Sequence, residues 1–530
     1  MKKSNIKKII LKALKAPLSD IKSLEKIKRE FAIEEKEMFI KNAEINKVYL
    51  EMLAKKEIAP NENLQKLLIT KKIRTLSGVA VIAVLTKPST CPGKCIYCPD
   101  EKNIPKSYLS NEPAVMRAIK TDFHPYKQVQ SRMKALQFNG HSTDKLEMII
   151  MGGTFSYFPS QYQTWFVKEC FRAANDFPKD KLSAKQKSSL KIEKKKNEKT
   201  KNRIIGLTLE TRQDYITPKE LVKFRMLGAT RIEIGTQNIF DDILKKNKRG
   251  HSVKATIRAT RLLKDAGFKI NYHLMPGMYG SSPKRDLKMF KEVFNNSNFQ
   301  PDLIKIYPCV VTDNSELFQM WKRREYTPLT NDGAKDLLKK IKSTVPQYTR
   351  ITRLIRDIPK ESIIAGPNIS NMRQIMQQEH VHCECIRCRE VGSDFTQKDK
   401  IIFDRINYNA SGGKEIFLQY VSPDKMKLYA ILRLRIPSKN NEMETLIPAL
   451  SNSALIREVH TFGKLAKINK TDSTSPQHIG LGKKLLKKAE EIIRKESTLK
   501  KIAIISGIGV REYYRKFDYK IEDEYMTKIL

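Results

Sequence analysis

Three cysteines near residue 91 have the spacing of an iron–sulfur ligand set. Cys91-Pro-Gly-Lys-Cys95-Ile-Tyr-Cys98 gives the pattern C-x3-C-x2-C, with an aromatic residue just before the last cysteine. Three thiolates can hold three irons of a 4Fe–4S cluster and leave the fourth iron open. An open iron can chelate S-adenosylmethionine (SAM), whose reductive cleavage gives a 5′-deoxyadenosyl radical. The spacing therefore predicts radical chemistry, and a zinc knuckle with a distant fourth ligand is the alternative.

A second group of thiols and imidazoles predicts a structural metal site. Its members are His380, His382, Cys383, Cys385 and Cys388. Tetrahedral zinc takes four such ligands. We predict that Cys309 completes the three thiols, with His380 or His382 as alternatives; ordinary reduced thiols are the other interpretation. Cys170 is predicted to be a core thiol.

A glycine-containing turn precedes a predicted helix, 483–495, in the C-terminal part. Its residues are Gln477, His478, Ile479, Gly480, Leu481 and Gly482, followed by Lys483. Free N–H groups and the helix dipole at such a turn bind phosphate, which predicts binding of the coenzyme A pyrophosphate. The pattern is similar to the Q/R-x-x-G-x-G/A motif of GCN5-related acetyltransferases. That resemblance implies that Tyr513 or Tyr514 approaches the acetyl-CoA sulfur; packing in the core is the alternative for these tyrosines.

Short apolar segments alternate with helical segments through the middle of the chain. Six strands are predicted, over residues 79–85, 146–151, 204–209, 231–235, 270–275 and 303–307. Repeated strand–helix alternation indicates a parallel sheet, and six units indicate an open or partial (β/α)6 barrel. The chemistry of such barrels lies at the carboxyl ends of the strands.

Polar and glycine residues follow the predicted strands, as a barrel active site requires. With the cysteine pattern they resemble the radical SAM superfamily. The resemblance implies that Gly152, Gly153 and Thr154 meet the SAM amino group. Glu210 and Arg212 end the third strand and are candidate catalytic residues. Glu233 and Gln237, on or after the fourth strand, are candidate cofactor-binding residues, although Glu233 could instead be a buried salt-bridge partner.

The charge balance predicts a polyanionic partner. Lys+Arg total 101 against 58 Asp+Glu, a formal net charge of +43. Such a field attracts nucleic acid, whose binding releases counterions; a solvated basic surface is the alternative. The lysine-rich stretch 179–203 is predicted to be an exposed insertion or a disordered loop. Apolar runs are too short to span a membrane, so we expect a cytoplasmic protein.

The pattern divides the chain into four predicted regions. A basic helical region covers 1–75, the radical SAM barrel 76–310, a linker with the metal site 311–400, and an α+β acetyltransferase-type domain 401–530. The fold class is therefore an α/β partial (β/α)6 radical SAM barrel joined to an α+β GCN5-related acetyltransferase domain.

This pairing of domains, with several longer strings, resembles the catalytic subunit of the Elongator complex in a single-chain form. The strings include Met151-Gly-Gly-Thr-Phe155, Leu209-Glu-Thr-Arg-Gln-Asp214, Arg249-Gly-His251, Arg356-Asp-Ile-Pro359 and Ser506-Gly-Ile-Gly-Val-Arg-Glu-Tyr-Tyr-Arg-Lys516. The resemblance covers about residues 70–530. Asp518 departs from it, since the family usually has glycine there, and the stretch 179–203 is unusual.

The resemblance implies 5-carboxymethylation of the tRNA wobble uridine. It implies SAM and a 4Fe–4S cluster as cofactors, zinc, acetyl-CoA as substrate, the tRNA anticodon stem-loop as partner, and an electron donor. The basic N-terminal region would hold the tRNA backbone, and the target base would be splayed from its loop. A homodimer and a single chain both remain open.

Two other functions compete with this one. A protein lysine acetyltransferase with a structural iron–sulfur domain would acetylate amines without radical chemistry. A non-catalytic RNA-binding scaffold would bind tRNA without cleaving SAM.

Overall fold

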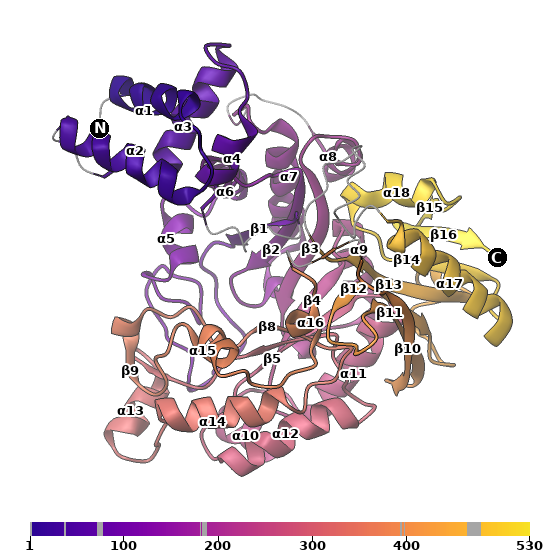
Figure 1. Ribbon diagram of the computed structural model, residues 1–530. Helices are drawn as coiled ribbons and strands as arrows, with labels where there is room; N and C mark the ends of the chain where they lie inside the picture. The colour runs from indigo at the N-terminus through magenta and orange to yellow at the C-terminus, as the bar shows by residue number, and fades with distance from the viewer. Residues whose placement is uncertain are drawn as a thin grey trace.

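The computed structural model describes residues 3–35, 39–70, 78–180, 182, 188–392, 395–396, 398–463 and 479–530. They form a bundle of N-terminal helices, a parallel sheet with covering helices, and a mixed sheet at the C-terminal end (Figure 1). Within these ranges, no helix combines the length and apolar character that crossing a membrane would require.

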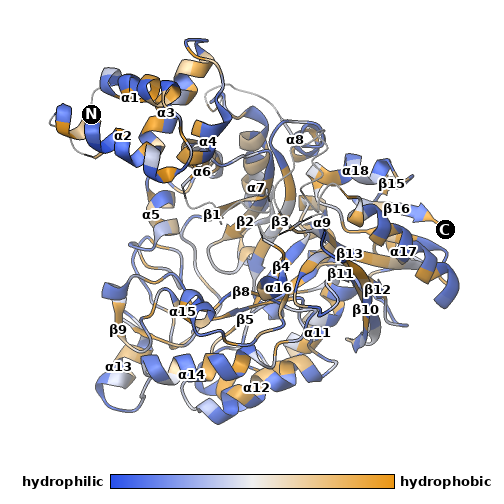
Figure 2. Cartoon of the chain, in the orientation of Figure 1, coloured by the Kyte–Doolittle hydropathy of each residue, from blue (hydrophilic) through white to orange (hydrophobic). Residues whose placement is uncertain are grey.

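The N-terminal region is helical, as predicted. Its helices are α1 (Lys3–Lys15), α2 (Ile21–Glu34), α3 (Asn42–Ala54) and α4 (Glu62–Leu68). Their apolar faces form a small separate core that includes Leu24, Tyr49 and Leu64. Figure 2 shows that each of these helices carries both hydrophobic and hydrophilic residues, which is typical of amphipathic helices. Several α1 lysines pair with glutamates, for example Lys7 with Glu57 at 2.7 Å, so part of the basic charge is locally balanced.

The parallel sheet confirms the predicted partial barrel and adds one strand to it. Its order is β1 (Ala80–Leu85), β2 (Lys145–Met151), β3 (Arg203–Thr211), β4 (Arg231–Gln237), β5 (Lys269–Leu274), β6 (Leu303–Ile306) and β8 (Arg350–Arg353). Every neighbouring pair in this sheet is parallel. The sequence did not predict β8, because its residues Arg-Ile-Thr-Arg carry little apolar signal.

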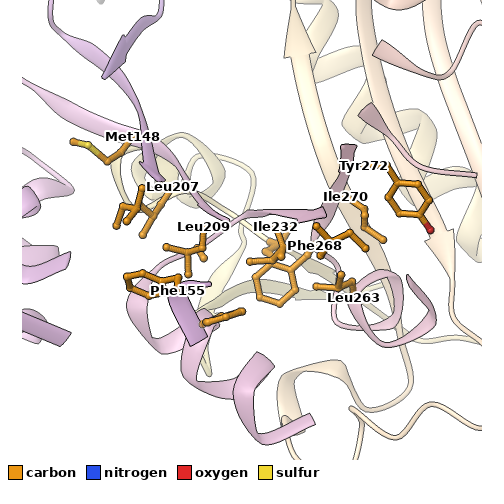
Figure 3. Close-up of a cluster of buried hydrophobic side chains, with 14 of the residues drawn as sticks. Met148, Phe155, Leu207, Leu209, Ile232, Leu263, Phe268, Ile270 and Tyr272 are labelled. Atoms are coloured by element: carbon orange, nitrogen blue, oxygen red, sulfur yellow. The ribbon is translucent and has the colours of Figure 1, made fainter. Parts of the chain in front are cut away.

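The strands alternate between a packed face and an open face. On β2, Leu146, Met148 and Ile150 are buried, whereas Glu147 and Met151 are partly exposed and line a cavity. The period of two puts alternate side chains on opposite faces. Figure 3 shows the packed face, where residues of β2 to β5 meet side chains from the loops and covering helices.

Helices cover the packed face of the barrel sheet. They are α6 (Pro125–Phe138), α7 (Ser160–Asp176), α9 (Pro218–Leu227), α11 (Val253–Asp265), α12 (Pro283–Asn295) and α14 (Asn331–Lys342). Buried residues of these helices belong to the same core as the strands, including Phe166, Phe224 and Phe290. Because helices cover only one face, the other face is free to form the cavity wall.

The C-terminal domain is a mixed sheet with α17 (Leu481–Glu496) against it. The strand order is β10 (Ile402–Ala410), β11 (Gly413–Val421), β12 (Leu428–Ile436), β13 (Ser453–Thr461), β14 (Lys501–Ile504), β16 (Tyr525–Ile529) and β15 (Lys520–Glu522). The short helix α18 (Arg511–Arg515) follows β14. This arrangement confirms the predicted α+β domain.

Buried charges join the two domains. Arg457 of β13 donates to Asp302, just before β6, at 2.8 Å, and to Glu415 of β11 at 3.0 Å. Arg435 of β12 contacts Asp265 at the end of α11 at 2.6 Å. All these groups are buried, and buried charges persist only when paired and hydrogen-bonded. The network therefore fixes the C-terminal domain on the barrel.

The lysine-rich stretch 179–203 is partly an ordered helix and not wholly the exposed insertion or disordered loop that its composition predicts; residues 181 and 183–187 lie outside the described residues. Residues Leu190–Asn197 form helix α8, and Glu193, Lys194 and Asn197 are buried, whereas Lys191, Lys195 and Lys196 are exposed. Composition alone could not show that Lys194 and Glu198 find charged partners in the C-terminal domain.

Candidate active site

One cavity of about 2330 Å³ lies between the barrel and the C-terminal domain. Its wall includes Cys91, Cys95, Cys98, Gly153, Thr154, Glu210, Arg212, Glu233 and Gln237 from the barrel, and Gly480, Gly482, Lys483, Tyr513 and Tyr514 from the C-terminal domain. Most of the residues singled out in the sequence thus line one cavity. Gln477 and His478 lie outside the described residues.

The first cysteine group forms part of the cavity wall just after β1. Arg249 Nη1 donates to Cys95 Sγ at 3.1 Å, and the Gly93 backbone N–H donates to Cys91 Sγ at 3.4 Å. A hydrogen bond with the Cys98 thiol, together with the charges of Arg249 and Arg212, lowers the pKa of Cys95 to about 4. These contacts favour the thiolate at Cys95, the form that binds iron, whereas the hydrogen bond with Cys95 and burial raise the pKa of the Cys98 thiol.

In the part of the chain that the structure describes, some buried polar atoms of the cavity wall have no hydrogen-bond partner. Among them are Arg212 Nη1, beside the cysteine loop, and Gln237 Oε1. A Cβ on Gly93 would lie 2.4 Å from Arg212 Nη1, so glycine is required for this guanidinium to reach the cysteine loop. Buried polar groups normally find partners, so these atoms are available to a bound group. The thiols and these atoms fit a 4Fe–4S cluster with SAM.

The glycines after β2 have different surroundings. A Cβ on Gly152 would lie 2.0 Å from Thr86 Oγ1, so this glycine serves packing against the end of β1. Gly153 has a φ of +102°, and a Cβ there would meet nothing within 4 Å. Gly153 and Thr154 line the cavity and Gly152 does not. Of the two glycines, Gly153 is therefore the one that leaves space for a ligand.

A charged cluster lies deeper in the barrel. Lys305 of β6 forms ion pairs with Glu233 and, at 3.3 Å, with Glu210. His273 Nε2 lies 2.8 Å from Glu233, and the Tyr108 hydroxyl donates to Glu210 at 3.1 Å. Burial opposes the charge of Glu233, but Lys305 and His273 hold the pKa of Glu233 well below its usual range.

Sequence reasoning identified the two glutamates of this cluster and missed His273 and Lys305. These two residues are partners in the β5–β6 register and line the cavity. Alternation along the strands could have found them, because His273 and Lys305 lie between residues that are buried in the core. Glu233 is a buried ion-pair partner, one of its two interpretations, and it also lines the cavity; its role in cofactor binding stays a prediction.

The C-terminal side of the cavity contains the glycine turn and the tyrosines. Gly480 caps α17 with a φ of +75°. A Cβ on Gly482 would lie 2.9 Å from Tyr513 Oη, which places the tyrosine hydroxyl over the helix N-terminus. Tyr513 is 38% exposed, whereas Tyr514 is only 6% exposed and packs against Tyr519. Tyr513 is thus the more accessible hydroxyl.

The flanking residues of the glycine turn take different positions. Ile479 is exposed and Leu481 is buried in the core of the C-terminal domain. Neither lines the cavity, whereas Lys483 does. Exposed N–H groups at the start of a helix of this length, beside a lysine, suit a phosphate group.

The second cysteine group brings three sulfurs together without Cys309. The Sγ atoms of Cys383, Cys385 and Cys388 lie within 4.8 Å of one another. Cys309 follows β6 and is buried with Cys95 and Tyr326 in another cluster, where burial raises the pKa of its thiol to about 12. The prediction of Cys309 as fourth ligand is therefore not met by this geometry: Cys309 N bonds to Pro276 O at 2.8 Å, which holds it in a separate loop contact.

The remaining thiol and imidazole predictions have clear outcomes. Cys170 is buried in the main core, as predicted for a core thiol. His380 and His382 are both exposed, and neither belongs to the metal-ligand group that Cys383, Cys385 and Cys388 form.

Comparison with known proteins gives consistent matches. The radical SAM superfamily model matches residues 86–292, and the radical SAM C-terminal domain model matches residues 301–381. A tRNA uridine(34) acetyltransferase of Methanocaldococcus infernus is 45% identical over 477 residues, covering 87% of each chain. Elongator complex protein 3 of Homo sapiens is 36% identical over 479 residues, covering 87% of this chain and 86% of that protein.

A solved structure is similar over most of the chain. Elp3 of Methanocaldococcus infernus, lacking its residues 1–46, has a TM-score of 0.72 and 41% sequence identity. The match covers 86% of this chain and all of that chain.

Proposed function

The chain belongs to the family of tRNA uridine(34) acetyltransferases and Elongator complex protein 3, and we propose that it converts the wobble uridine of tRNA to 5-carboxymethyluridine. It contains a radical SAM domain. Acetyl-CoA is the proposed source of the two added carbons, and the anticodon stem-loop is the proposed partner.

One observation carries this proposal: the cysteine loop and the glycine turn of the C-terminal domain line the same cavity. A hydrogen atom can pass only between groups in contact, so a radical source and an acetyl donor must share one enclosed space. Separate pockets would instead favour a lysine acetyltransferase with an unrelated iron–sulfur domain.

Residues around the first cysteine group are proposed to hold the cofactor. Cys91, Cys95 and Cys98 would ligate a 4Fe–4S cluster, which with SAM supplies a radical able to remove hydrogen from a methyl group. Arg249 and Arg212 stabilise the thiolate charge. Gly153 leaves room for the amino group of SAM. Arg212, predicted as catalytic, is thus proposed as a residue that supports the cysteine loop.

Residues on the opposite side are proposed to hold acetyl-CoA. The N-terminus of α17, with Gly480, Gly482 and Lys483, would bind the pyrophosphate. Tyr513, whose hydroxyl lies beside Gly482, would direct that hydroxyl at the thioester. The C-terminal domain would therefore present the acetyl group to the barrel and would not transfer it to an amine.

Atoms and electrons balance in the proposed conversion of uridine. Hydrogen removal from the acetyl methyl gives a carbon radical that forms a bond to C5 of uridine. Loss of the C5 proton and one electron restores the double bond, and this electron offsets the one consumed in SAM cleavage. Water then cleaves the thioester and releases coenzyme A. Glu210, held by Lys305 and Tyr108, is the proposed acceptor for the C5 proton.

The cavity wall also suits a nucleic acid. Its basic residues include Arg203, Arg231, Arg350, Arg353, Arg356 and Arg373. Guanidinium groups bind phosphates in a bidentate manner, and such binding weakens as salt rises.

Anaerobic incubation with SAM, a reductant, acetyl-CoA and tRNA, followed by nucleoside mass analysis, tests the proposal. We expect 5-carboxymethyluridine with the wild-type chain and none with Cys95→Ala. Efficient SAM cleavage without any modified uridine would contradict the proposed function.

A further inference from the structure

We infer that helix α8 of the barrel positions the tyrosine helix α18 of the C-terminal domain, with Glu198 as the central positioning residue. The inference rests on the proposed function only where it concerns acetyl-CoA. It assigns a role to the lysine-rich stretch, which no part of the proposed chemistry uses. Figure 1 shows α8 beside α18, although more than 300 residues separate them in the chain.

Helix α8 is fixed on the barrel by its own buried polar contacts. Asn175 of α7 donates to Glu193 Oε2 at 2.7 Å, and Asn197 donates to Asn175 Oδ1 at 2.7 Å. Asn197 Oδ1 also accepts from the Ile204 backbone N–H at 2.7 Å, at the start of β3. These bonds tie both ends of α8 to barrel elements, so α8 can act as a rigid support.

From this support, side chains of the barrel reach the C-terminal domain. We call the resulting ion-pair group the α8–α18 cluster: Lys194, Glu198, Arg511, Arg515 and Glu524. Glu198 lies 2.9 Å from Arg515 and 3.3 Å from Arg511, the two arginines at the ends of α18. Lys194 Nζ lies 2.7 Å from Glu524 Oε1, and Glu524 also pairs with Arg511.

The turn before α18 packs directly on β3. A Cβ on Gly507 would lie 1.9 Å from Ile205 O, and one on Gly509 would lie 2.5 Å from Arg203 Cβ. Only glycine allows this approach of two backbones. The segment that carries Tyr513 and Tyr514 is therefore held between β3 on one side and α8 on the other.

Glu198 is buried where it contacts the two arginines of α18. Glu198 is 2% exposed and reaches the cavity wall. Burial alone would raise its pKa, but the hydrogen bond from Arg515 and the charges of both arginines lower it. Removing the charge of this buried carboxylate breaks the ion pairs that join both arginines of α18 to the barrel, and leaves Arg511 paired with Glu524 and Arg515 with Glu512 inside the C-terminal domain. Tyr513 lies between these arginines in the chain, so its hydroxyl position over Gly482 depends on them.

Hydrogen exchange of the full chain without acetyl-CoA tests the positioning itself. Glu198→Gln keeps the side-chain volume and removes the charge. We expect the backbone amides of 508–517 to exchange roughly tenfold faster, while those of β13 stay unchanged. The control is Glu442→Gln, because Glu442 forms an exposed ion pair with Arg261 of α11 at 3.0 Å across the same domain boundary, far from α18 in the chain. This control should leave 508–517 unchanged.

The partner side of the pair gives a second, independent variant. Arg515→Gln should speed the same exchange, and the double variant with Glu198→Gln should add little to either single change. Independent, additive effects would overturn a direct role for the pair. Unchanged exchange at 508–517 in every folded variant would overturn the inference as well.

Acetyl-CoA binding connects the positioning to function. Calorimetry should show a Kd for acetyl-CoA raised about tenfold in Glu198→Gln, since small misplacements of binding groups are costly. Glu198→Asp should recover part of the affinity, and reductive SAM cleavage should stay at the wild-type rate. An unchanged Kd would overturn the link to acetyl-CoA. If the wild-type chain binds no acetyl-CoA, the proposed function fails, and the exchange data alone decide the positioning.

Discussion

The two cysteine groups use the same ligand atom in different settings. Cys383, Cys385 and Cys388 have sulfurs that already converge within 4.8 Å. Cys91, Cys95 and Cys98 do not form such a group among the described residues; all three line the cavity, with Arg249 beside Cys95, whereas Cys388 alone of the second group lines it. Converging thiols suit a small ion that holds a loop. Thiols along a cavity, next to arginines and unpaired polar atoms, suit a larger cofactor that also takes a ligand.

The largest expected effect comes from separating the two groups by mutation. Cys95→Ala should reduce 5′-deoxyadenosine formation to background, because the cluster loses a ligand. Cys388→Ala is the matched change in the second group, and we expect it to leave iron content and SAM cleavage in place. The measurement is iron content and 5′-deoxyadenosine under anaerobic, reducing conditions. Equal losses in the two variants would remove the distinction.

The second prediction concerns Arg249, which lies beside Cys95 in the first group. Arg249→Leu should lower the rate of SAM cleavage about 10- to 100-fold, the usual cost of losing a partner of a metal ligand. Arg249→Lys keeps the charge and should lose less. A leucine variant with wild-type SAM cleavage and iron content would show that the Arg249–Cys95 contact has no functional weight.

The third prediction concerns the metal content of the second cysteine group. We expect one zinc per chain at the second group, and Cys383→Ser should lose it while keeping iron at the first group. The Tm should fall, because a zinc ion at these thiols would hold the segment between the barrel and the C-terminal domain. Retention of zinc in Cys383→Ser would place the metal elsewhere.

The last prediction concerns the effect of pH on the junction between the barrel and the C-terminal domain. The first cysteine group lines the cavity between these domains, and the buried Glu415 is part of the charge network that joins them. Burial disfavours its charge, but Arg457, Lys264 and Arg435 lower the pKa of Glu415 from 4.5 to about 2. Because the folded pKa is depressed, its contribution is complete above pH 4.5 and is lost as pH falls toward 2.

Denaturant unfolding of the metal-free chain at several pH values measures this contribution. We expect Glu415 to account for about 3 kcal/mol of unfolding free energy, lost over that range. Glu415→Gln should show a flatter dependence on pH. A variant as acid-sensitive as the wild type would exclude Glu415 as a source.

Much of the site could be predicted from the sequence because its motifs are local. The cysteine spacing, Gly153 with Thr154, and the Gly480–Gly482 turn each encode a chemical requirement within a few neighbouring residues. Strand alternation likewise predicted six of the seven parallel strands, since their apolar residues are dense.

The parts that sequence reasoning missed depend on distant contacts. His273 and Lys305 are single residues whose meaning appears only when β5 and β6 lie side by side. Cys309 was grouped with the later cysteines by residue type, but its loop holds it in another cluster. Lys194 of α8 and Glu198 directly after it could not be predicted as buried, because their partners, Glu524 and Arg511, lie at the far end of the chain.

The central claim is that the cysteine loop and the glycine turn of the C-terminal domain act on one acetyl group inside one cavity. Acetyl-CoA deuterated in its methyl group, incubated anaerobically with the chain, SAM, reductant and tRNA, tests it most directly. The predicted result is transfer of one deuterium to 5′-deoxyadenosine, with the other two retained in the carboxymethyl group of the uridine. Unlabelled 5′-deoxyadenosine, together with acetylation of amines that persists in Cys95→Ala, would contradict the claim and favour a lysine acetyltransferase.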